Sequence, residues 1–126
     1  MSYIYHHMGI PTTEEKPNER YSEHFKMYTT PGDNPFRIQF HRFEPGCPLH
    51  PLIQTVPHVG FKVDDLSKAI KGHKVIMEPY EPFEGFKTAM IEVNGVPVEL
   101  IETSLPEEKI WSGAALKNSF IYPDEH

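Results

Sequence analysis

The sequence predicts a single α+β domain in which two βαβββ modules form a cupped, mixed β-sheet. A phrase that begins with histidine occurs twice, as HHMGIPT from His6 and as PHVGFKV from Pro57, and such a repeat indicates a duplicated structural unit. Two further segments, FHRFEP and VELIET, also correspond, and each closes one copy of the repeat. We expect the modules at about residues 3–47 and 56–103, followed by a tail at residues 104–126.

The first module is expected to be the shorter of the two. Its strands are predicted where β-branched and aromatic residues gather or alternate with polar ones, at residues 2–12, 26–30 and 36–45. The polar segment between the first two strands contains Pro17, so it predicts at most one short helix from about Asn18. The proline-rich residues 46–55 are expected to connect the modules. The first copy therefore keeps the strands but has a degenerate helix region.

The second module shows the same plan in a fuller form. Strands are predicted at residues 58–63, within 73–85, and at 86–93 and 96–103. A short helix is expected between the first two, with Asp64 or Asp65 as its N-cap and Gly72 at its end. The dipeptide Asn94-Gly95 predicts a tight hairpin between the last two strands. The tail is expected to contain about one helical turn.

The composition excludes several classes of protein. A formal charge of −6 with scattered Lys and Arg argues against a nucleic-acid partner. No apolar segment approaches the roughly 20 residues of a membrane-spanning helix, and the N-terminus has no signal-peptide pattern. The single cysteine, Cys47, has no partner for an internal disulfide, which suits a reducing cytoplasm. We therefore expect a cytoplasmic protein without a nucleic-acid or membrane partner.

The repeat selects four residues as candidate metal ligands. His7 and His58 lie at the start of the two similar strands, and the closing segments pair His41 with Glu99. If the two modules pack into a shared cup, these four side chains converge from corresponding positions. Three imidazoles and one carboxylate suit one divalent transition metal ion, which the residue types leave open among Zn, Ni, Co, Mn and Fe. Of the histidine pair, His7 is selected because it aligns with His58, and His6 is placed on the opposite face of its strand.

Three further residues are candidates for binding a substrate. Arg37 and Gln39 share a strand face with His41 and are expected to point into the cup, where Arg37 would pair with an acidic group. Tyr80 lies in a predicted loop and is expected to cover the mouth of the site. By contrast Glu44, which closes its strand on the opposite face, is expected to be structural or exposed.

The segments HHMGIPT, FHRFEPG, PHVGFKVDDLSKAI and FKTAMIEVNGVPVELIE together resemble the glyoxalase/bleomycin-resistance/extradiol-dioxygenase superfamily, the vicinal oxygen chelate proteins. The resemblance covers most of the chain from about residue 5 to residue 103. It implies that the opening and closing strands supply the ligands, which here correspond to His7, His41, His58 and Glu99. It also implies a small substrate that binds the metal through two adjacent oxygens, and a homodimer.

The resemblance leaves three functions open. The first is a metal-dependent lyase or isomerase of the glyoxalase type, in which Glu99 or His41 moves a proton. This sequence departs from that branch in having His41 where relatives usually have Glu or Gln. The second is an Fe(II) extradiol-type dioxygenase, because two His and one carboxylate are ligands of non-haem iron. The third is a metal-free protein that binds a small molecule in the cup.

Overall fold

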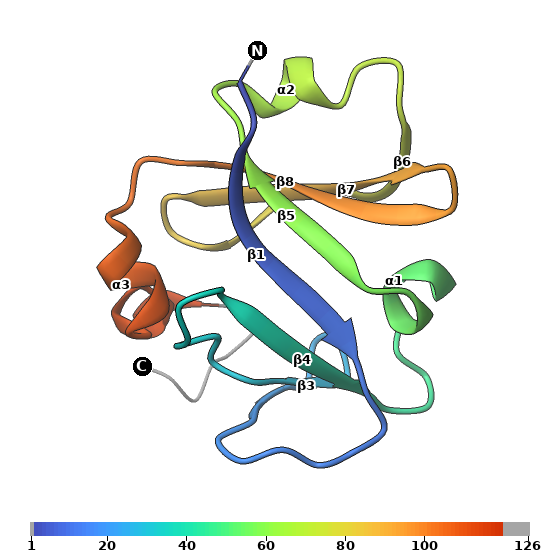
Figure 1. Cartoon of the computed structure of the whole chain (residues 1–126), viewed down its shortest axis with the longest axis vertical. Helices are drawn as coiled ribbons and strands as arrows, with labels where there is room; N and C mark the ends of the chain where they lie inside the picture. Colours follow the sequence, from blue (N-terminus) through green and yellow to red (C-terminus); the bar gives the residue numbers. More distant parts are fainter. Residues whose placement is uncertain (1, 120–126) are drawn as a thin grey trace.

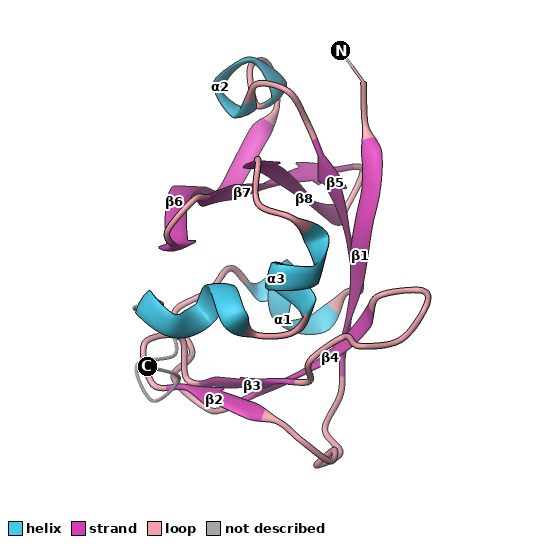
Figure 2. Cartoon of the chain, turned by 90° about the vertical axis from the view of Figure 1, so that its left-hand side faces the viewer, coloured by secondary structure: helices cyan, strands magenta, loops and turns pink. Residues whose placement is uncertain are grey.

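The computed structural model describes residues 2–119, and these form one curled sheet of eight strands in the order β2-β3-β4-β1-β5-β8-β7-β6. The sheet bends into a half-barrel, so that its two outer thirds face each other across a hollow (Figure 2). Parallel and antiparallel pairs both occur, which confirms the cupped, mixed sheet expected from the sequence.

The first half of the chain supplies four strands, which are β1 (Ile4–Pro11), β2 (Arg20–Ser22), β3 (Met27–Thr29) and β4 (Ile38–Phe43). Strand β1 runs parallel to β4, which pairs antiparallel with β3. The second half supplies β5 (His58–Lys62), β6 (Lys74–Phe83), β7 (Phe86–Val93) and β8 (Val96–Thr103). Strand β5 likewise runs parallel to β8, which pairs antiparallel with β7. Both halves therefore have the same strand order.

The two halves meet where β1 pairs antiparallel with β5, at the centre of the sheet (Figure 1). In that pair His7 lies opposite Gly60, and Gly9 lies opposite His58. Around Met8 the pairing is thus symmetric, and the symmetry relates each residue from His7 to Gly9 to the residue 51 positions later in β5. The repeated phrase occupies corresponding places in the two halves.

Helices are few and short. Helix α2 (Leu66–Ala69) follows β5 and begins at the predicted cap Asp65, whose carboxylate accepts from the Lys68 N–H. Helix α3 (Glu107–Trp111) and the 3₁₀ helix η1 (Ala114–Asn118) belong to the tail, and α1 (Pro51–Thr55) joins the two halves. Helices α1 and α3 lie in the hollow of the sheet, whereas α2 lies outside it (Figure 2). Within residues 2–119, no helix has the length and apolar character that crossing a membrane requires.

Apolar cores lie on both faces of the sheet. Consecutive residues of β8 alternate between them, because successive side chains of a strand point to opposite faces. Leu100 packs with Val63, Leu66 and Ala69 beneath α2. Ile101 packs on the other face, in a cluster that contains Phe83, Phe86, Ile110, Trp111 and Leu116. The tail therefore completes the apolar lining of the hollow.

The segment near Asn18, where at most one short helix was expected, forms none; Asn18 has a φ of 63° and strand β2 follows. Two local expectations were wrong. The connection predicted at residues 46–55 contains helix α1, because His50 supplies an N-cap that accepts from the Leu52 N–H and Pro51 starts the first turn. Tyr80 lies in strand β6, opposite Thr88 of β7, rather than in a loop.

Candidate metal centre

Three strands bring His7, His58 and Glu99 together on the concave face of the sheet. His7 of β1 lies opposite Gly60 of β5, and Gly60 lies opposite Glu99 of β8, so the three positions form one row across the sheet. His58 is two residues before Gly60 and therefore shares its face. Because Gly60 has no side chain, the His7 ring and the Glu99 carboxylate can lean across it and meet.

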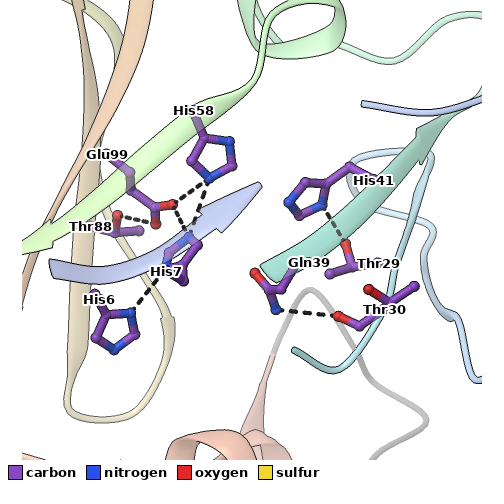
Figure 3. Close-up of polar contacts among 9 residues, drawn as sticks. All are labelled: His6, His7, Thr29, Thr30, Gln39, His41, His58, Thr88 and Glu99. Carbon is purple, nitrogen blue, oxygen red and sulfur yellow. Dashed lines mark hydrogen bonds and ion pairs between the residues drawn. The ribbon is translucent and has the colours of Figure 1, made fainter. Parts of the chain in front are cut away.

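The facing atoms of these three side chains form a nearly equilateral triangle (Figure 3). His7 Nε2 lies 3.0 Å from Glu99 Oε1 and 3.2 Å from His58 Nε2, and His58 Nε2 lies 3.1 Å from the same oxygen. Ligands bound at about 2.1 Å from a metal are separated by about 3.0 Å at a right angle and about 3.4 Å at a tetrahedral angle. The triangle therefore fits one face of a coordination polyhedron, and the cluster could hold one metal ion.

The electrostatics of the triangle favour a positive charge at its centre. Lone pairs of two nitrogens and one carboxylate oxygen repel one another unless a proton or a cation lies between them. Burial by itself raises the pKa of Glu99, but the charge of His7 and hydrogen bonds from His58 and His7 hold that pKa well below its ordinary value. Glu99 is therefore ionised although it is buried, and a carboxylate must be ionised to bind a metal.

The second oxygen of Glu99 has a partner of its own. Thr88 Oγ1, which is buried on β7, donates to Glu99 Oε2 over 2.6 Å. This bond turns Oε1 toward the two histidines and fixes the carboxylate plane. Sequence reasoning missed Thr88, although alternation in the strand at residues 86–93 puts it on the same face as Met90. Met90 is the residue that pairs directly with Glu99, and Thr88 pairs with Ile101.

The glycine in each repeated phrase makes room for a histidine of the opposite phrase. A Cβ atom on Gly60 would lie 2.7 Å from His7 Cε1, and one on Gly9 would lie 2.2 Å from His58 Cε1. Neither glycine has a positive φ, so the backbone alone does not require glycine there. The repeated His-x-Gly pattern is thus a packing requirement of the two histidines, which the sequence reasoning did not recognise.

The placement of His6 on the opposite strand face was wrong. The register of β1 against β5 shifts between Tyr5 and His7, so His6 is an extra residue in a β-bulge. The bulge interrupts the alternation of faces, and both His6 and His7 are buried on the concave side, with their Nδ1 atoms 2.9 Å apart. Burial and the neighbouring His7 lower the pKa of His6 to about 4, so this ring is neutral at physiological pH.

The predicted correspondence of His41 with Glu99 was also wrong. Gly60 of β5 faces Glu99 of β8, whereas the corresponding Gly9 of β1 faces Gln39 of β4. The symmetry of the two halves therefore pairs Gln39, and not His41, with Glu99. The error is a shift of two residues, which alternation cannot reveal because it leaves the strand face unchanged. The amide nitrogen of Gln39 donates to the Thr30 carbonyl over 3.3 Å, which leaves the amide oxygen available to the hollow (Figure 3).

His41 lies beside the triangle rather than in it. Its ring stacks against that of His58 with the centroids 5.4 Å apart, and its Nδ1 atom is 3.0 Å from Thr29 Oγ1. Its Nε2 atom is buried and has no hydrogen-bond partner among the described residues. Burial and the nearby His58 lower the pKa of His41 to about 3, so the ring is neutral and one of its two nitrogens carries no proton.

The candidate centre lies in a cavity of about 160 Å³ between the two arms of the sheet. Most of its lining is apolar, and includes Phe25, Met27, Phe43, Met77, Met90 and Trp111. Gln39 and Tyr80 line the cavity, as does the cationic Arg20, which sequence reasoning did not select.

Arg37 does not line the cavity, contrary to expectation. Its φ of 55° places it outside β4 and out of phase with His41, and its guanidinium covers the Trp111 ring at 4.9 Å. It therefore packs against the tail, through a cation–π contact.

No protein-family model matches the sequence of this chain, and no curated protein matches it either.

Proposed function

We propose that the protein is a metal-dependent lyase or isomerase of the glyoxalase type, which acts on a small molecule with two adjacent oxygens. The observation that carries this proposal is the buried triangle of His7 Nε2, His58 Nε2 and Glu99 Oε1 in the wall of a cavity. The two halves of the sheet would be the two modules of that superfamily, and the first would have lost its helix.

Gln39 supplies the fourth ligand in this proposal. It corresponds to Glu99 by strand register, and its amide oxygen is a suitable ligand for a hard divalent ion. Relatives of the glyoxalase type usually have Glu or Gln at this position, so the departure noted from the sequence alone disappears. A bound ion would act as a Lewis acid toward the negative charge that develops on the substrate oxygens.

His41 is the proton acceptor in this proposal. Its Nε2 atom is buried at the cavity and has no hydrogen-bond partner among residues 2–119, and Thr29 Oγ1 lies 3.0 Å from the opposite nitrogen. A pKa of about 3 makes His41 a weak base in the free protein, but an anionic substrate nearby would raise that pKa. Glu99 is less suited to this task, because Thr88 and the two histidines already occupy its oxygens.

One observation favours an Fe(II) dioxygenase as the second candidate. The triangle contains two histidines and one carboxylate, the ligand set of non-haem iron oxygenases, and His41 is not part of it. The apolar lining of the cavity suits an aromatic substrate equally well. Oxygen uptake with catechols, measured for the Fe(II)-loaded and the Zn(II)-loaded protein, distinguishes this function from proton transfer.

The first experiment measures metal content. Elemental analysis of the purified protein should find about one divalent transition metal ion per chain, and a His58→Ala/Glu99→Ala variant should lose it. A His73→Ala variant is the matched control, because His73 is exposed and does not line the cavity. A folded wild-type protein that binds no metal, but binds an aromatic ligand in the cavity, would overturn the proposal in favour of a binding protein.

The second experiment tests the reaction class. Metal-loaded protein is incubated in D₂O with α-hydroxy and α-keto thioesters and acids, and exchange of the proton next to the carbonyl is followed by NMR. We expect exchange that His41→Gln abolishes while the metal content stays the same. Oxygen uptake without any proton exchange would contradict the lyase or isomerase assignment.

A further inference from the structure

His6 is buried beside the candidate centre and has no part in the proposed ligand set. Its Nδ1 atom lies 2.9 Å from Nδ1 of His7, whose other nitrogen is a corner of the triangle. On its far side, the His6 ring packs against Trp111, with the centroids 5.0 Å apart. The bulge in β1 places this second histidine directly behind a ligand.

The far nitrogen of His6 faces an acidic residue of the tail. His6 Nε2 lies 3.4 Å from Glu107 Oε2, an oxygen that also accepts from the indole N–H of Trp111 over 3.0 Å. No aligned hydrogen bond to His6 Nε2 occurs within the described residues, although this atom is buried. Glu107 is about half exposed, at 51%, so a small side-chain rotation can complete the bond.

Only one arrangement of protons satisfies these contacts while His7 binds a metal. The metal requires the lone pair of His7 Nε2, so the His7 proton lies on Nδ1. That proton faces His6 Nδ1, which must then accept it, so the His6 proton lies on Nε2 and faces Glu107. The position of the proton on His7 thus determines its position on His6, and the proton on His6 in turn faces the exposed carboxylate of Glu107.

We propose that His6, held by Glu107, is a positioning residue that orients His7 and fixes its tautomer for metal binding. This inference rests on the proposed metal centre. It gives the bulge in β1 and helix α3 related roles, because the bulge places His6 behind the ligand His7 and the helix supplies Glu107, which holds His6. A metal-bound histidine commonly donates its second N–H to such an acceptor, and loss of that acceptor typically costs about 10–100-fold in metal affinity.

The test measures zinc affinity by competition with a chromophoric chelator. His6→Phe keeps an aromatic ring against Trp111 but removes the acceptor, and we expect zinc binding about 10–100-fold weaker than in the wild type. His6→Asn places an amide oxygen near the position of Nδ1 and should recover most of the loss. His73→Phe, at an exposed site, should bind zinc like the wild type. Unchanged affinity in His6→Phe, or equal losses in His6→Phe and His6→Asn, would overturn the inference.

A second measurement needs no variant. Long-range ¹H–¹⁵N NMR of the zinc-loaded wild type should show the His7 proton on Nδ1 and the His6 proton on Nε2. A His7 ring that carries its proton on Nε2 overturns the inference even where zinc binds. If the folded wild type binds no zinc at all, both the metal centre and this inference fail. Failure of the inference alone therefore differs from failure of the metal centre, because only in the first case does zinc still bind.

Discussion

Replacing Gly60 with alanine should disturb the candidate centre more than it disturbs the fold. Gly60 lies between His7 and Glu99 in the row across the sheet. A Cβ atom there would lie 2.7 Å from Cε1 and 2.9 Å from Nδ1 of His7, whereas ordinary contact begins at 3.4 Å. The ring must therefore move by about 0.7 Å, which exceeds the roughly 0.5 Å within which ligands need to be held.

The expected effects can be separated into affinity and stability. Displacement of His7 should weaken zinc binding by about 10–100-fold, the range seen when a ligand loses its orientation. Crowding of the buried ring should destabilise the metal-free protein by about 1–3 kcal/mol. The lower entropy of the unfolded alanine chain offsets about 0.4–1 kcal/mol of that cost. Urea denaturation with a chelator present measures the free energy of unfolding.

A double-mutant cycle with His7→Ala provides the control. In that background the ring is gone, so Gly60→Ala should be neutral or slightly stabilising. The sign of its effect should thus depend on His7. The reasoning fails if Gly60→Ala costs the same in both backgrounds, or if it leaves both the stability and the zinc affinity of the otherwise wild-type protein unchanged.

Three other changes have expected outcomes that follow from single contacts. Thr88→Val removes the 2.6 Å bond to Glu99, and should lower the free energy of unfolding of the metal-free protein. The loss should be about 1.5–3 kcal/mol by urea denaturation, and zinc binding should weaken too; unchanged stability would contradict this. Asp65→Ala removes the cap of α2 and should lower the free energy of unfolding by about 1 kcal/mol. The zinc affinity, measured by chelator competition, should stay the same. For His41, the folded pKa of about 3 lies below the ordinary 6.5, so the unfolded chain binds more protons between these values. Stability of the metal-free protein should therefore fall as the pH falls through this window, and His41→Gln should reduce that slope by about 1.4 kcal/mol per pH unit; an unchanged slope would refute the assignment.

Most strands were predictable from the sequence because their signals are local. The strand at the start of each half, the Asn94-Gly95 hairpin and the cap at Asp65 all lie where periodicity and turn chemistry place them. Both residues of the hairpin turn have positive φ, of 50° and 82°, which asparagine and glycine tolerate. The predictions from sequence fail where a single residue breaks the alternation of a strand, as at Arg37, whose φ of 55° places it outside β4.

The candidate centre was predictable in part, since the repeat selects residues together. His7, His58 and Glu99 converge because the repeat places two of them symmetrically and the parallel strand brings the third into register. Gln39 was selected for a different role, and the correspondence with His41 was wrong by two residues. Strand alternation determines which face a residue occupies, but only the pairing of neighbouring strands determines its position along that face.

The sequence by itself therefore determined the duplicated plan, the strand that contains each candidate ligand, and the chemistry of a histidine and carboxylate centre. Only the tertiary structure decided that a bulge turns His6 inward behind His7, and that His41 remains beside the triangle. It also decided that the tail packs Trp111 and Glu107 against the concave face. The reason is physical: periodicity and turn preferences act between neighbours in the chain, whereas a bulge, a strand register and a helix in the hollow depend on packing between residues far apart in sequence.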